Sequence, residues 1–296
     1  MSNTLEYKIR EINKCLKKDF LCLPPYQCIN GILVNELYND VKNNIPIVNK
    51  ITQMVKLPWQ RAYQMEYRFL KANIFTPFLH VIEYATYDVY NKNAICAYLS
   101  LLPLVEALFR KWGMETPDLT IEKMSKIIDK NLEYFNSLIK NECFPKDRRF
   151  IPESYLEYLK FILQEVFYIS FKKCETNNFL EVFNRNLSLH KLEGLTNNKE
   201  ISNNVTRILL LVDVVAELYL MQNPQEYWYN ILEIEYQKDL DFQIRFELYK
   251  KILFSNLYPT NINYIQDIFL NSTDGNKKRD LLEKLKLQNN LIDKVL

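Results

Sequence analysis

Glycine is scarce in this chain and is never clustered. The 296 residues include only four glycines, Gly31, Gly113, Gly194 and Gly275. A loop that wraps a phosphate group, or the first turn of a dinucleotide-binding fold, requires several glycines within a few residues. The wide spacing of these four therefore excludes Walker-type and Rossmann-type nucleotide sites.

Histidine is scarcer still, and the cysteines follow no metal-binding spacing. The two histidines are His80 and His190, and no CxxC pair accompanies them. A structural zinc site is therefore disfavoured, and we expect no metal and no cofactor. Most cysteines should be buried thiols in a reducing, cytoplasmic compartment. They are Cys15, Cys22, Cys28, Cys96, Cys143 and Cys174.

Long apolar runs and a strong net charge are also missing. No stretch approaches the roughly 20 consecutive apolar residues of a membrane-spanning helix, and the charged N-terminal segment lacks the apolar core of a signal peptide. We therefore expect no membrane partner. The formal net charge is only +2, too small to attract nucleic acid by an overall field. Any anion binding must depend on a local group of residues.

Apolar residues at helical spacing are what the chain has in plenty. They make up 48% of the sequence and recur at i, i+3, i+4 and i+7 in segments such as 155–167 and 205–219. In the second segment, Leu211 and Leu218 widen the apolar stripe beyond one face, which indicates a central helix. Ser202 is a plausible N-cap for it. The sequence predicts an all-α fold.

Two further helices are predicted around a proline and a glycine. Residues 93–112 are apolar on several faces, so Pro103 should kink that helix or begin a new first turn, and Gly113 should end it. The next helix should run from an N-cap at Thr116 to about Lys140.

Three short motifs predict little chemistry. Asn30-Gly31 and Asp274-Gly275 could form hairpin turns, but no alternating apolar residues flank them, so a β-rich fold is disfavoured. His80 is interpreted as a core or packing histidine. The 20 tyrosines and 17 phenylalanines lie on helical apolar faces, which favours core packing over base stacking.

The chain divides into three regions with soft boundaries. Residues 1–85 form an N-terminal helical region with several turns, and residues 223–296 form a C-terminal region that ends in Lys-rich amphipathic helices. Between them, residues 86–222 hold four or five helices, the size of one antiparallel bundle.

One pair of residues carries recognisable chemistry. Arg185 and His190 are separated by four residues, between two apolar helical segments. On a regular helix they would stand about 140° apart around the axis, so they share a face only where the helix begins or bends. The guanidinium offers a fork for phosphate oxygens, and the imidazole can move a proton near neutral pH. Together they suit phosphodiester cleavage by an internal 2′-hydroxyl without a metal.

This Arg-x4-His motif resembles that of the HEPN superfamily (higher eukaryotes and prokaryotes nucleotide-binding). The segment from Leu101 to Leu108, LLPLVEAL, is similar to the "LLPxxEG" helix of bacterial members. The resemblance covers roughly residues 86–222. It implies a HEPN-like antiparallel helical bundle that forms a homodimer. In catalytic members the two motifs meet across the dimer and cleave RNA without a metal, commonly in toxin–antitoxin or anti-phage systems.

The resemblance also implies roles for individual residues. Arg185 would bind the scissile phosphate, and His190 would act as general base or acid. Asn186 would orient the pair, and Glu106 matches an acidic position on the earlier helix. Many relatives have glycine directly after the histidine; here Lys191 takes that place, and it could add a phosphate contact.

A non-catalytic reading stays open beside the nuclease. The chain could be a helical module that binds RNA, a nucleotide or a protein partner. A third reading is a purely structural scaffold, with the N- and C-terminal helical regions as docking surfaces. In both of these readings His190 caps a helix end, and Glu106 forms an ion pair with Arg110 four residues later.

Overall fold

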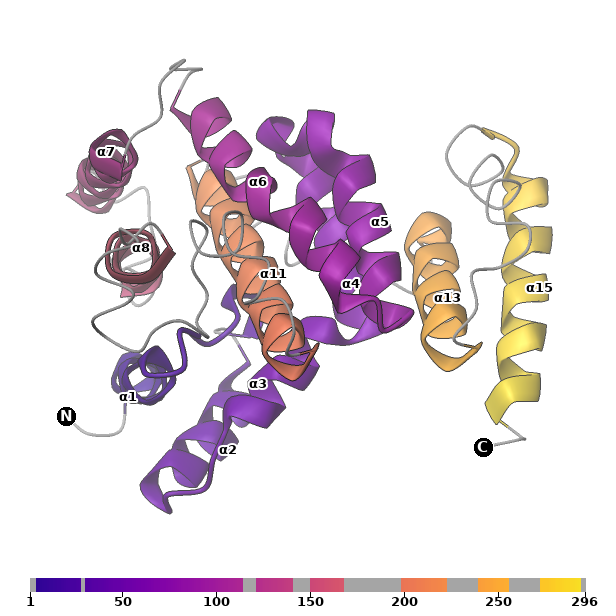
Figure 1. Ribbon diagram of the computed structural model, residues 1–296, viewed down its shortest axis with the longest axis horizontal. Coiled ribbons are helices and arrows are strands. Elements are labelled where there is room, and N and C mark those ends of the chain that lie inside the picture. The colour runs from indigo at the N-terminus through magenta and orange to yellow at the C-terminus, as the bar shows by residue number, and fades with distance from the viewer. Residues whose placement is uncertain are drawn as a thin grey trace.

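The protein is built from α-helices. The computed structural model describes residues 4–27, 30–113, 121–140, 150–167, 198–222, 239–255 and 272–293. Every regular element within these ranges is helical and none is a strand, which confirms the predicted all-α class (Figure 1).

The helices follow one another with short connections in the first half of the chain. The N-terminal five are α1 Leu5–Lys17, α2 Gly31–Lys42, α3 Val48–Lys56, α4 Pro58–Tyr67 and α5 Leu79–Tyr90. Short 3-10 turns lie at Pro25–Gln27, Phe69–Lys71 and Asn73–Phe78. The later helices are α6 Ala94–Trp112, α7 Ile121–Lys140, α8 Phe150–Ile162 with a π-helical turn at Leu163–Phe167, α11 Asn198–Met221, α13 Leu240–Ser255 and α15 Gly275–Asp293.

Helix α11 lies at the centre, as its wide apolar stripe predicts. The five consecutive residues from Ile208 to Val212 are all buried, so every face of the helix is covered. Its beginning, however, was predicted wrongly. Asn198 is already helical, and Ser202 lies inside the helix, where its hydroxyl accepts a hydrogen bond from the Lys56 ammonium at 2.8 Å. A serine at the start of an apolar stripe therefore marked a tertiary contact rather than an N-cap.

Helices α6 and α11 pack along each other and run in the same direction (Figure 1). Their first turns meet at one cavity, which Ala94 and Ser202 line. Their last turns meet at another, lined by Trp112 and Gln222. This parallel pair departs from the strictly antiparallel order that the resemblance implies.

Helices α7 and α8 form a second pair that runs across the first. Figure 1 views α7 and α8 nearly along their axes, whereas α6 and α11 run across the page. Contacts join α6 to α7, α7 to α8, and α8 to α11, so the four helices enclose one apolar core. That core continues into α1, α2, α3 and the 3-10 turns, and it crosses the predicted boundary at residue 85.

Local signals at several helix ends were confirmed. Helix α6 ends at its C-cap Gly113, and α7 ends at Lys140. Pro103, by contrast, begins no new helix: α6 continues through it, because the surrounding turns keep their helical conformation. The predicted N-cap Thr116 lies outside the described residues. Neither Asx-Gly pair makes a hairpin: Asn30 and Asp274 cap α2 and α15 by accepting backbone N–H bonds.

A smaller apolar core joins the C-terminal helices to the rest. Helix α13 packs on α4 and α5, and α15 covers the other side of α13 (Figure 1). Tyr63, Tyr87 and Tyr90 supply the inner face, while Leu248 and Leu282 come from the two outer helices. Within the described ranges, no helix combines the length and the apolar character needed to cross a membrane.

Candidate functional site

Only one of the five predicted site residues falls within the described ranges. Glu106 lies on α6, whereas Arg185, Asn186, His190 and Lys191 lie outside the described residues. The proximity of the arginine to the histidine, on which the nuclease hypothesis depends, therefore stays a prediction.

Glu106 forms a local ion pair. Its Oε1 accepts from Nη2 of Arg110 at 2.6 Å, one helical turn further along α6. The Glu106 side chain is 19% exposed and that of Arg110 is 39% exposed. A half-exposed i,i+4 pair contributes about 0.3–0.5 kcal/mol, so this contact alone explains little of the stability of α6. This is the pairing that the non-catalytic reading predicts for Glu106.

The other histidine contradicts its interpretation. His80 is the second residue of α5 and is exposed, whereas the sequence predicted a core position. The apolar residues around it, such as Phe75 and Ile82, face the core from neighbouring turns, and His80 points away from them. The thiols also vary: Cys22 is buried, Cys15 is partly buried and Cys96 is exposed.

Sequence reasoning missed a row of buried ion pairs between α4 and α11. Arg61 donates to both carboxylate oxygens of Asp213, with Nη1–Oδ1 at 3.1 Å. One turn further along α11, Oε1 of Glu217 accepts a hydrogen bond from Nε of Arg68 at 2.7 Å. The guanidinium of Arg68 also lies 4.7 Å from the ring centre of Tyr63. All four charged side chains are at most 3% exposed.

Burial controls the ionisation of the first pair. Desolvation raises the pKa of Asp213 to about 6, and the neighbouring Arg61 charge opposes that rise. For Arg61, burial lowers the pKa, but the Asp213 carboxylate has the larger combined effect, so the pKa lies above its ordinary value. The signal in the sequence was a pair of acidic residues four positions apart on an otherwise apolar helix. Their arginine partners stand about 150 residues earlier.

A second buried cluster joins α13 to α4 and α5. Arg245 donates from Nε to Glu66 at 2.6 Å and from Nη1 to Glu83. Glu83 also accepts from the hydroxyls of Tyr87 at 2.7 Å and Tyr249 at 3.1 Å. Burial raises the pKa of Glu66, and the Arg245 charge acts in the opposite direction. In both clusters, other protein groups pair with the buried charges. Both clusters therefore hold helices together and are not open binding sites.

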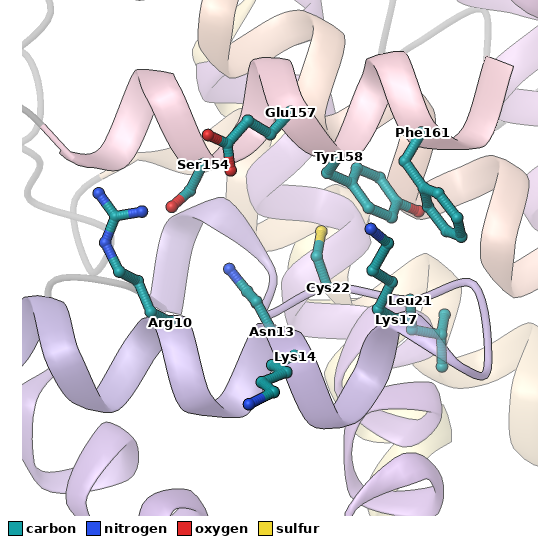
Figure 2. Close-up of a pocket in the computed structure, with 10 residues that line it drawn as sticks. All are labelled: Arg10, Asn13, Lys14, Lys17, Leu21, Cys22, Ser154, Glu157, Tyr158 and Phe161. Atoms are coloured by element: carbon teal, nitrogen blue, oxygen red, sulfur yellow. The ribbon is translucent and has the colours of Figure 1, made fainter. Parts of the chain in front are cut away.

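An open cavity lies between α1 and α8 (Figure 2). It has a volume of about 300 Å³, and Arg10, Lys17, Glu157, Tyr158 and Cys22 are among the residues that line it. Two of its cationic side chains have partners within the protein. Arg10 pairs with two nearby glutamates on α1 and α8, and the Lys17 ammonium lies 4.3 Å from the centre of a phenylalanine ring.

The lining of this cavity lacks a pair of groups that could carry out proton transfer or nucleophilic attack. Burial raises the pKa of Tyr158 well above its usual value, so its hydroxyl stays protonated, and it donates to the Phe20 carbonyl at 3.2 Å. The figure shows Glu157 pointing away from the Cys22 thiol. We therefore do not assign this cavity a catalytic role.

Two further observations complete the description of the site. Across the described ranges, no group of three or more His, Cys, Asp or Glu side chains is placed to hold a metal ion. Comparisons of the chain with protein-family models, with curated proteins and with solved structures found no match.

Proposed function

We propose that the chain is a metal-independent endoribonuclease of HEPN type that acts as a homodimer, in anti-phage or toxin–antitoxin defence. The observation that carries this proposal is the Arg185-x4-His190 motif, which precedes the central helix α11 by a few residues. In addition, α6, which bears Glu106, packs along α11. The resemblance spans both of these helices, although it implies an antiparallel order and α6 and α11 run in the same direction.

The reaction needs no group beyond these side chains. The 2′-oxygen of RNA attacks the adjacent phosphorus while His190 removes the hydroxyl proton. The bond from phosphorus to the 5′-oxygen breaks, and this leaving oxygen takes a proton from the imidazole that the other subunit supplies. Arg185 stabilises the negative charge on the phosphate oxygens. The products are a 2′,3′-cyclic phosphate and a 5′-hydroxyl.

The test is cleavage of end-labelled single-stranded RNA in the presence of EDTA. We expect His190→Ala and Arg185→Ala each to reduce the rate at least about 100-fold, the range for loss of a proton-transfer group. His80→Ala is the matched control, because His80 is exposed on α5 and outside the motif. A substrate with 2′-deoxyribose at the cleaved position should resist the enzyme. Cleavage that persists in His190→Ala would overturn the assignment.

A second candidate function is non-catalytic binding of RNA, a nucleotide or a protein partner. It is favoured by the ion pair between Glu106 and Arg110, the pairing that this reading expects for the acidic residue. Binding of RNA without product, together with a monomeric mass by light scattering at micromolar concentration, would support this candidate over the nuclease.

A further inference from the structure

A cavity at the shared start of α6 and α11 gathers positive charge. It has a volume of about 370 Å³, and its charged lining residues are Lys56 from the end of α3, Lys92 from the turn before α6, and Lys199 from the first turn of α11. None of the described residues that line it is a carboxylate. In this respect it differs from the α1–α8 cavity, which Glu157 lines and in which Arg10 pairs with two glutamates.

Lys56 is the least solvated of the three cations. Its ammonium donates to the carbonyl oxygen of Ser202 at 3.0 Å and to its hydroxyl at 2.8 Å. Both acceptors are neutral, and in the part of the chain that the structure describes Lys56 makes no ion pair. Burial accordingly lowers the pKa of Lys56 to about 8. A partly buried ammonium without a counter-charge is costly, and an anion in the cavity would offset that cost.

The first turn of α6 adds backbone donors. The first N–H groups of a helix have no partner within the helix, and a side-chain cap usually satisfies one of them. Here the side chain of the N-cap residue Asn93 makes no such cap, and its amide nitrogen donates to Asp88 at 3.4 Å. Ala94, the first residue of the helix, lines the cavity. Backbone N–H groups at a helix start are well suited to phosphate oxygens.

The rest of the lining is aliphatic. Val89, Ala94 and Val205 contribute it, with Val205 buried and Val89 partly buried. A bare inorganic anion would leave these side chains without a contact. At about 370 Å³ the cavity also falls in the range of about 300–1,000 Å³ that holds small organic ligands.

We propose that this cavity binds a small phosphorylated molecule, with the phosphate group at Lys56, Lys92 and Lys199 and the organic part against Val89, Ala94 and Val205. The lysines supply the charge, and the first turn of α6 supplies N–H donors. This binding site is independent of the proposed nuclease reaction, because none of its residues belongs to the Arg-x4-His motif.

Isothermal titration of the full chain at low salt tests the proposal, with inorganic phosphate, adenosine 5′-monophosphate and adenosine as probes. We expect the monophosphate to bind more tightly than inorganic phosphate, and adenosine to bind at least tenfold more weakly than the monophosphate. Binding should weaken as the pH rises through about 8, because burial lowers the pKa of Lys56 to about 8 and its ammonium loses its proton there.

Variants identify the cavity as the site of binding. Lys92→Met and Lys199→Met change exposed side chains and should leave the fold intact, and each should weaken binding of the monophosphate by about threefold to tenfold. Lys56→Met should abolish it. Lys14→Met, which alters the cavity between α1 and α8, is the matched control and should bind as the unaltered chain does.

Three results would overturn the proposal. The first is the absence of binding by both phosphate probes at millimolar concentration. The second is equal affinity for adenosine and its monophosphate. The third is binding of a short single-stranded RNA through the same lysines without binding of the monophosphate, which would assign the cavity to a nucleic-acid backbone. None of these results depends on whether the chain cleaves RNA.

Discussion

At the residue scale, the buried ion pairs join residues that lie far apart in the sequence. Asp213 and Glu217 were visible as two carboxylates on an apolar helix, and a buried carboxylate requires a partner. Their partners, Arg61 and Arg68, could not be identified from the sequence, because helical periodicity reports which face is buried and not which helix covers it. Glu106 is different: its local partner Arg110 was predicted, because it is only one turn away on the same helix.

The pair of Arg61 and Asp213 leads to a stability prediction. Arg61→Met leaves the Asp213 carboxylate buried without its cation and should lower the free energy of unfolding by about 3–5 kcal/mol. Replacing both residues, in Arg61→Met with Asp213→Leu, should restore much of that loss, because no charge then remains buried. Urea denaturation measures both values. Equal losses in the single and double variants would show that the guanidinium stabilises through its packing rather than its charge.

At the element scale, residues within one turn of a helix end predicted that end correctly. A polar residue near the start of α11 did not predict the start of the helix, because it makes a tertiary contact. Gly113 and Lys140 mark helix ends as predicted, because termination depends on local backbone conformation. Ser202 misled the prediction, since a hydroxyl near a helix start can accept a hydrogen bond from another helix as readily as from its own backbone. The direction of α6 relative to α11 likewise could not be predicted from the sequence, because no local signal encodes it.

Pro103 provides a prediction for helix α6. It is exposed in the middle of the helix, where proline lacks the N–H that would bond the carbonyl of Leu99. Pro103→Ala should therefore raise the free energy of unfolding by about 1–3 kcal/mol. Thermal unfolding followed by circular dichroism measures the gain. Ser100→Ala, on the same helix, is the control and should change it by less than about 0.5 kcal/mol. A loss of stability in Pro103→Ala would mean that the proline ring fits a bend that the packing requires.

At the scale of the whole molecule, the C-terminal helices complete the fold around α4 and α5. Arg245 supplies the cation for Glu66 and Glu83, and Tyr249 packs against Tyr87 with ring centres 5.9 Å apart. The all-α class followed from the periodicity of the sequence. The packing of α13 and α15 onto the first half of the chain did not, because long-range pairing leaves no local pattern.

Truncation tests this attachment. A chain that ends at Gln222 loses Arg245 and leaves Glu83 buried without a cation, so its melting temperature should fall on the order of 10 °C. A chain that ends at Ser255 keeps α13 and should lose less, because α15 contacts mainly the outer side of α13. Unchanged melting of the shorter chain would indicate that residues 223–296 fold as a separate unit.

The common direction of α6 and α11 has an electrical consequence. Each helix carries a partial positive charge of about half an elementary charge at its beginning and an equal negative one at its end. Antiparallel neighbours cancel these dipoles, but here they add, although the formal net charge is only +2. The positive N-terminal ends of both helices lie at the cavity that Lys56 lines. The C-terminal ends of both helices lie at a cavity lined by Lys111 and Lys130, whose charges offset the negative potential there. An approaching anion is therefore attracted to the N-terminal ends of α6 and α11.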